Sequence, residues 1–305
     1  MNDIFYFIEK SDIYKYADDN SLSVADIDID TIIDNLQHDI NILGTWFDDN
    51  SMSLNNKKCQ FLIIESLANS RQEIKYINAA DNNIEESKEC KLLGIKIDNN
   101  ITMVDHIKGI CNIAGNKLNA LARISKYLDE NKRKLLMKSF IISQFQYCPI
   151  IWMYCQRRSN NLINRIHERA LRIAYNDYIS DFDSLLKKDN TVTIHQRNIQ
   201  TLAVEIYKSL NELGPKLMNE ILYLKENTPN TRKQQLVYPN PHTVTYGLET
   251  FGYKAAHIWS SLPNDIQKTN NINIFKEFIS SNCSKLCNCN ICTTYVANLG
   301  YVNIS

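Results

Sequence analysis

The stretch "SDIYKYADDNSLSV", residues 11–24, places two adjacent acids, Asp18 and Asp19, between two runs of alternating polar and apolar side chains. Alternation with a period of two predicts a β-strand, and two such runs around a polar tetrapeptide predict a β-hairpin. The tetrapeptide Asp-Asp-Asn-Ser consists of residues that favour turns. Two like charges at the tip of a hairpin repel each other by about 1 kcal/mol when they are exposed. The stretch is therefore either a solvated turn or a hairpin whose acids bind a cation.

A divalent cation would remove the repulsion between the two carboxylates. Mg²⁺ takes hard oxygen ligands and is typically held by one or two carboxylates together with the phosphates of a substrate. Nucleotidyl transfer uses two such ions about 4 Å apart, one at the attacking hydroxyl and one at the leaving pyrophosphate. For two adjacent acids alone, a solvated turn is the more frequent explanation, so the surrounding sequence has to decide.

The composition divides the chain into regions of opposite charge. The 305 residues, of which 44% are hydrophobic, suffice for one large domain or two to three small ones. Only eight Gly and six Pro favour long regular elements, mostly helices. The net charge is zero, yet residues 1–50 hold twelve acids against two Lys, and residues 123–172 hold eleven Lys and Arg against three acids. Such a division suits a protein that binds metal ions in one region and phosphates in another, with two solvated faces as the general alternative.

The hydrophobic pattern becomes purely helical after residue 98. Before it, a helical period covers residues 31–47, and short strands are expected at 52–64, 74–77 and 90–98. After it, the sequence predicts helices over residues 107–122, 131–145, 162–173, 199–213, 253–260 and 272–279. The fold class that follows is α+β.

The chain shows no sign of a secreted or membrane protein. Residues 1–10 lack the basic region of a signal peptide, and the apolar stretch 140–154 is too short and too polar to span a bilayer. Five cysteines within apolar patterns are expected to be reduced, buried thiols: Cys59, Cys90, Cys111, Cys148 and Cys155. We expect an intracellular protein, nuclear or cytoplasmic, with no membrane partner.

Four motifs in a fixed order give the hairpin a family context. A first likeness comes from "YADD", residues 16–19, which resembles the catalytic hairpin of reverse transcriptases. The segments around this hairpin in non-LTR (LINE-type, jockey-like) retrotransposon polymerases are similar to "NDIFYFI" (2–8), "LGTWFDDNSMSLNNKKCQFLII" (43–64) and "KLLGIKID" (91–98). The likeness is strong over residues 1–176 and loose beyond them.

The resemblance implies an α+β fold with a partial polymerase palm, followed by a mostly α-helical thumb and C-terminal region. Its domains would be the distal palm (1–100), the thumb (101–156), a helical post-thumb region (157–282) with a loop near 226–247, and a Cys-rich tail (283–305). The family's fingers, its glycine-rich segment and the palm strand with a third metal-binding Asp have no counterpart. The resemblance thus implies an RNA-directed DNA polymerase that is present as a truncated, inactive fragment.

The family's functional residues carry over onto the matching positions. Asp18 is expected to be the main Mg²⁺ ligand of a two-ion site and Asp19 its partner. Tyr16 and Ala17 would lie under the primer end, and Gly94 would let the backbone approach the primer strand. The implied partners are an RNA template, a DNA primer and dNTP.

Basic residues have two expected roles. Lys58 matches the Lys of a family motif and would protonate the leaving pyrophosphate as a general acid, with Lys57 as its rival and simple surface exposure as the alternative. The first part of the basic region is expected to bind nucleic acid through phosphate contacts and comprises Arg123, Lys126, Lys132, Arg133, Lys134 and Lys138. For the arginines of residues 157–172, nucleic-acid contact and a solvated helix face stay equally open.

Four thiols lie within ten residues near the end of the chain, at Cys283, Cys287, Cys289 and Cys292. Four thiolates can bind one tetrahedral Zn²⁺, so this cluster is a candidate zinc site, with free thiols as the alternative. Only Cys289 and Cys292 have the usual two-residue spacing, and the closest histidine in sequence is His257. His106 and His167 lie near helical faces and are expected to be structural or solvated.

Two functions fit this sequence. The first is the reverse transcriptase of a non-LTR retrotransposon, working by two-metal nucleotidyl transfer. The second is a non-catalytic nucleic-acid-binding helical protein derived from the thumb and the C-terminal region. A third acidic ligand would discriminate between them, but Asp28 and Asp30 follow the hairpin, whereas the family's third acid precedes it.

Overall fold

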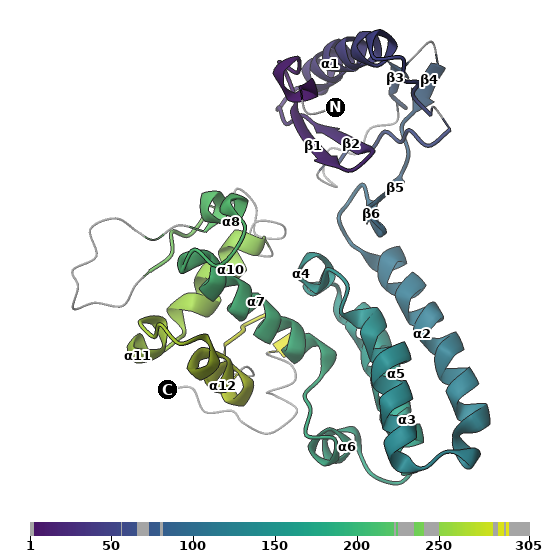
Figure 1. The fold of residues 1–305 in the computed structure, drawn as a ribbon, viewed down its shortest axis with the longest axis vertical. Helices are drawn as coiled ribbons and strands as arrows, with labels where there is room; N and C mark the ends of the chain where they lie inside the picture. Colours follow the sequence, from purple (N-terminus) through teal and green to yellow (C-terminus); the bar gives the residue numbers. More distant parts are fainter. Residues whose placement is uncertain are drawn as a thin grey trace. The chain divides into compact units, whose positions relative to one another are not determined.

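The fold is given by a computed structural model, which describes residues 3–55, 57–65, 73–79, 82–222, 224, 235–240, 250–282, 286–289 and 291–292. These residues form helices and small antiparallel sheets, which confirms a protein with both α and β structure. The chain divides into two compact units, Met1–Met103 and Val104–Ser305. The named strands belong to the first unit, and the second is built from helices (Figure 1).

The described part of the first unit contains two-stranded antiparallel hairpins and one long helix. Its elements are η1 (Ile4–Tyr6), β1 (Asp12–Tyr16), β2 (Asp19–Ser23), α1 (Ile29–Asp49), β3 (Tyr76–Ala79), β4 (Asn82–Glu85), β5 (Glu89–Leu92) and β6 (Ile95–Asp98). The hairpin predicted at residues 11–24 is confirmed, because β1 pairs with β2 along its whole length. The helix predicted over residues 31–47 is confirmed as α1.

Two strand predictions are wrong. Residues 90–98 form the β5–β6 hairpin and not a single strand. Leu93 and Gly94 both have positive φ angles, 46° and 88°, which is the conformation of a type I′ turn. The described residues of 52–64 belong to no named strand, and Phe61 forms only an isolated parallel bridge.

Helix α1 contributes to both small cores of the first unit. It begins after Asp28, whose carboxylate accepts a hydrogen bond from the Thr31 N–H at 3.0 Å and thereby caps the first turn. One core joins the last turns of the helix to the first hairpin, with Ile13 and Leu22 packed beside Leu43. The other core joins the earlier turns of α1 to β3. The first hairpin is therefore held against a long helix.

The second unit is an array of helices. Its first half contains α2 (Val104–Ile124), η3 (Ser125–Tyr127), α3 (Glu130–Leu136), the π-helical turn η4 (Met137–Ile141), η5 (Ile142–Phe145), α4 (Pro149–Trp152) and α5 (Arg157–Tyr175). Its second half contains α6 (Phe182–Lys188), α7 (Ile194–Leu210), α8 (Lys216–Ile221), α10 (Phe251–Ser260), α11 (Asn264–Gln267) and α12 (Ile272–Asn282). Most helix predictions are confirmed, but the helix expected over residues 131–145 divides into α3, η4 and η5.

Two groups of helices build this unit. Helices α2, α3 and α5 pack together, and α7 packs against α10 and α12 (Figure 1). The core around α7 contains Met153, which precedes α5, together with Cys287, Cys289 and Cys292, which follow α12. Residues assigned to the thumb, the post-thumb region and the tail thus share one core. Within the described chain, every helix is too short or too polar to cross a membrane.

Candidate functional site

The tip of the β1–β2 hairpin brings together four residues of the predicted site. Tyr16 and Asp19 form the last pair of the ladder, and Ala17 and Asp18 are the two turn residues between them. Ala17 has a φ of 54°, a left-handed conformation that is strained for a residue with a Cβ. All four side chains are exposed. Both carboxylates therefore stand where a cation or a charged substrate can reach them.

A buried carboxylate, Asp39 of α1, holds the start of this hairpin. Its Oδ2 accepts hydrogen bonds from Lys10 N at 2.9 Å, Ser11 N at 2.7 Å and Ser11 Oγ at 2.6 Å. Its Oδ1 accepts a longer one from Glu9 N at 3.3 Å. Burial by itself would raise the pKa of Asp39, but the hydrogen bonds from Ser11, His38 and the backbone outweigh burial and lower the pKa below its usual value. The carboxylate is therefore a charged anchor between α1 and β1.

Asp18 and Asp19 supply two possible metal ligands, and no third ligand joins them among the described residues. Among the described residues, the groups of His, Cys, Asp and Glu that could hold a metal ion do not include Asp18 or Asp19. Lys58 and Lys57 are exposed on the segment that follows α1, and Gly94 lies in the β5–β6 turn. The roles that the resemblance implies for these three residues stay predictions.

Part of the predicted nucleic-acid surface is engaged within the protein. Arg133 donates hydrogen bonds from Nε to the carbonyl of Ala174 at 2.9 Å and from Nη1 to the carbonyl of Leu128 at 2.6 Å. Lys134 lies over the Tyr175 ring, with Nζ 4.7 Å from its centroid. These two side chains tie α3 to the end of α5, so their first role is structural.

Other members of the predicted nucleic-acid surface are more exposed to solvent. Arg123 and Lys126 are exposed near the end of α2, and Lys126 Nζ lies 4.8 Å from the ring centroid of Tyr127. Lys132 is exposed as well, although its Nζ lies 2.9 Å from the carboxylate of Asp129, the residue that caps α3. An exposed pair of this kind is worth about 1 kcal/mol or less, so Lys132 can exchange this partner for a phosphate.

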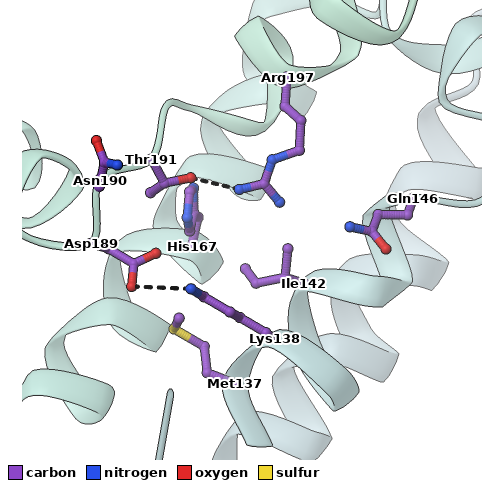
Figure 2. Close-up of a pocket in the computed structure, with 9 residues that line it drawn as sticks. All are labelled: Met137, Lys138, Ile142, Gln146, His167, Asp189, Asn190, Thr191 and Arg197. Carbon is purple, nitrogen blue, oxygen red and sulfur yellow. Dashed lines mark hydrogen bonds and ion pairs between the residues drawn. The ribbon is translucent and has the colours of Figure 1, made fainter. Parts of the chain in front are cut away.

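The sixth member, Lys138, lines a cavity of about 260 Å³ between η4, α5 and the start of α7 (Figure 2). Lys138 Nζ lies 3.7 Å from the carboxylate of Asp189, and Arg197 donates one hydrogen bond to Thr191 Oγ1 at 2.6 Å. Nδ1 of His167 is buried without a partner in the described chain. Burial, followed by the positive charge of Arg197, lowers the pKa of His167 to about 3. The cavity therefore holds two cations, one carboxylate and a neutral imidazole.

A second candidate site lies in the core around α7, where four buried side chains converge: His195, Cys287, Cys289 and Cys292. Their ligand atoms all lie within 4.8 Å of one another, and Cys289 Sγ is 3.3 Å from His195 Nε2. One imidazole and three thiols in this arrangement form a group that could hold a metal ion.

The start of α7 positions the histidine. Thr193 and Gln196 form a capping box, so the helix begins at a defined residue and His195 occupies its first turn. Nδ1 of His195 lies 3.1 Å from the carbonyl of Met153, which leaves Nε2 for the cysteines. The Tyr154 ring packs edge-on against the imidazole, with centroids 6.2 Å apart.

The three thiols titrate as one group. Hydrogen bonds from Cys287 and then from Cys292 lower the pKa of Cys289. The hydrogen bond with Cys289 raises the pKa of Cys287 to about 11, and those with Cys287 and then Cys289 raise the pKa of Cys292. Of the three thiols, Cys289 is therefore the one whose thiolate is favoured, with its two neighbours as hydrogen-bond donors. A thiolate held inside a core is the species that a metal ion binds.

The predicted zinc ligands are confirmed in part. Cys287, Cys289 and Cys292 do converge, whereas Cys283 lies outside the described residues. His257 is the closest histidine in sequence, but the histidine that joins the cysteines in the fold is His195, 94 positions before Cys289. No local sequence pattern predicts this contact, because it depends on how α7 packs. His106 and His167, expected to be structural or solvated, are buried.

Comparisons of the chain with models of protein families, with curated proteins and with solved structures found no match. The likeness to reverse transcriptases therefore rests on the sequence motifs.

Proposed function

We propose that this chain is part of the reverse transcriptase of a non-LTR retrotransposon, an RNA-directed DNA polymerase. The observation that supports the proposal is the β1–β2 hairpin, which exposes Asp18 and Asp19 at a tip flanked by Tyr16. The anchor formed by Asp39 keeps the base of this hairpin against α1, as a carboxylate site that must hold its shape requires.

In this function the two carboxylates bind Mg²⁺, which supplies the positive charge that phosphoryl transfer needs. Asp18 and Asp19 orient the ion, Tyr16 packs against the primer end, and Lys58 protonates the leaving pyrophosphate. Mg²⁺ prefers octahedral oxygen coordination and keeps its waters tightly. Two carboxylates alone therefore bind it weakly, and a further acid beside the hairpin is required.

Primer extension tests this function. The chain is joined to the upstream palm and fingers of a non-LTR reverse transcriptase, and extension of a DNA primer on an RNA template is measured with Mg²⁺ and dNTP. Asp18→Asn should abolish extension, because it removes a charged ligand. Asp12→Asn, at an exposed acid of the same hairpin, is the matched control and should leave extension unchanged. Full activity of Asp18→Asn would refute the proposal.

The second candidate, non-catalytic nucleic-acid binding, is favoured by the cavity that Arg197 lines. The partly buried Arg197 guanidinium and the Lys138 ammonium share one carboxylate, Asp189, among the residues that line the cavity, so one of the two cations is without a counter-ion of its own. A backbone phosphate supplies that counter-ion, and Lys138 and His167 line the same cavity (Figure 2). Both functions require sequence-independent binding of phosphates.

Binding to an RNA–DNA hybrid at several salt concentrations tests the second candidate. Arg197→Met should weaken binding about equally for unrelated sequences and should make it less sensitive to salt. The exposed Arg165 of α5 provides the control, Arg165→Met. Equal losses in both variants would show that the cavity has no special role.

A further inference from the structure

We infer that His195, Cys287, Cys289 and Cys292 bind one Zn²⁺ ion as a closed structural site. The inference is independent of any polymerase activity, since all four ligands lie in the helical unit. It assigns His195 as the fourth ligand, in the place that the sequence pattern alone gives to Cys283.

The distances fit a tetrahedral ion. Zn–S bonds of about 2.3 Å and a Zn–N bond of about 2.0 Å place neighbouring ligand atoms about 3.5–3.8 Å apart. The four ligand atoms of this cluster lie within 4.8 Å of one another, and His195 Nε2 is 3.3 Å from Cys289 Sγ. Small rotations of the cysteine side chains are enough to close such a shell around an ion.

The chemistry of the ligands selects zinc. Three thiolates and one imidazole are a set that structural zinc sites use, whereas Mg²⁺ and Ca²⁺ require oxygen. All four side chains are buried in the apolar core, so no coordination position faces solvent. A site without an open position serves the fold and not a reaction.

The surroundings of the cluster are built to orient its ligands. The carbonyl of Met153 accepts the Nδ1 proton of His195 and so fixes the tautomer that binds a metal through Nε2. Zn²⁺ with three thiolates carries one negative charge, and a cation lies nearby. Lys254, only 4% exposed, stands over the Tyr154 ring at 5.3 Å, and this ring also packs on His195.

The metal would join two distant segments. His195 belongs to the first turn of α7, and the cysteines follow α12, the helix that packs along α7. One ion therefore closes a loop of more than 90 residues and stabilises the core against opening.

Metal analysis of the full chain tests the inference. The protein is purified without chelators, its zinc content is measured by atomic emission, and Co²⁺ is then substituted to report thiolate ligands by absorption. We expect one Zn²⁺ per chain and a tetrahedral Co²⁺ spectrum with sulfur-to-metal charge transfer. His195→Ala should weaken Zn²⁺ binding by more than the ~10–100-fold that loss of an outer-shell partner produces.

Two matched controls and one rescue make the result decisive. His257→Ala, on α10, and Cys283→Ser should retain the metal, because the proposed shell of four ligands is complete without either residue. His195→Cys should retain Zn²⁺ through four sulfurs and shift the Co²⁺ spectrum, which covers the case in which His195→Ala fails to fold. A chain without stoichiometric zinc, or one that loses zinc through Cys283→Ser and keeps it in His195→Ala, would overturn the assignment.

Discussion

Substitution of Asp39 by Asn tests whether this buried carboxylate anchors the hairpin. The change keeps the shape of the side chain and removes its charge. Three hydrogen bonds converge on Oδ2, from Lys10 N, Ser11 N and Ser11 Oγ, at 2.6–2.9 Å. A bond to a charged group is worth about 1.5–3 kcal/mol, against about 0.5–1.5 kcal/mol for a neutral one. If the amide oxygen replaces Oδ2, each bond weakens by about 1 kcal/mol, so the variant should lose about 3 kcal/mol.

Hydrogen exchange over residues 9–23 measures this loss directly. A loss of about 3 kcal/mol speeds exchange at the amides of Lys10 and Ser11 about 100-fold when exchange occurs through local opening. Asp34→Asn, at an exposed acid of the same helix, is the control and should leave exchange unchanged. Protection in Asp39→Asn equal to that of the parent would refute the anchor.

The same carboxylate predicts a pH dependence with a defined sign. The folded pKa of Asp39 is lowered, so its charge stabilises the hairpin above the pKa of the unfolded chain, about 3.9. That stabilisation is lost as the pH falls from about 4 through the folded pKa. Exchange at Ser11 should accelerate over this window in the parent, and Asp39→Asn should lack the step.

Two further predictions address the turn and the basic surface. Ala17→Gly should stabilise the hairpin by about 1 kcal/mol, because glycine adopts a positive φ without strain; slower exchange over residues 9–23 would report it, and faster exchange would contradict it. Arg133→Ala should destabilise the helical unit in urea by about 2 kcal/mol or more, because two carbonyls lose a charged donor. Lys126→Ala, at an exposed position near the end of α2, should weaken nucleic-acid binding and leave stability unchanged. Lost stability in Lys126→Ala together with unchanged stability in Arg133→Ala would contradict both predictions.

Local periodicity predicts much of this fold because it depends only on which face of an element is buried. The hairpin at residues 11–24 and helices such as α1 and α2 follow this rule, since each packs one continuous apolar face. The helix expected over residues 131–145 does not. A π-helical turn and a 3₁₀ turn follow α3 there, and Ser143 Oγ bonds back to the carbonyl of Ser139 at 2.6 Å. A change from α-helical to π-helical and 3₁₀ turns leaves the spacing of the apolar residues almost unchanged. The hydrophobic period therefore cannot predict it.

Turn chemistry explains the missed β5–β6 hairpin. Residues 90–98 read as one strand because Leu93, an apolar residue, occupies a turn position that usually takes Asn or Asp. Gly94 was the usable signal, since a glycine within a strand pattern often marks a change of direction.

The two candidate sites also differ in how far the sequence predicts them. Asp18 and Asp19 are adjacent in sequence, whereas the ligands around His195 are brought together by packing. A polar side chain on the buried face of a helix costs free energy unless it finds a partner. Asp39 on α1 and His195 on α7 are both such residues, and each partner comes from a segment at least 28 positions away. A helix that keeps an acid or an imidazole on its apolar face thus predicts that a long-range contact exists, while the identity of the partner follows only from the fold. For His195, the partners are cysteines that follow α12, and the packing of α12 along α7 supplies the reason that the two segments meet.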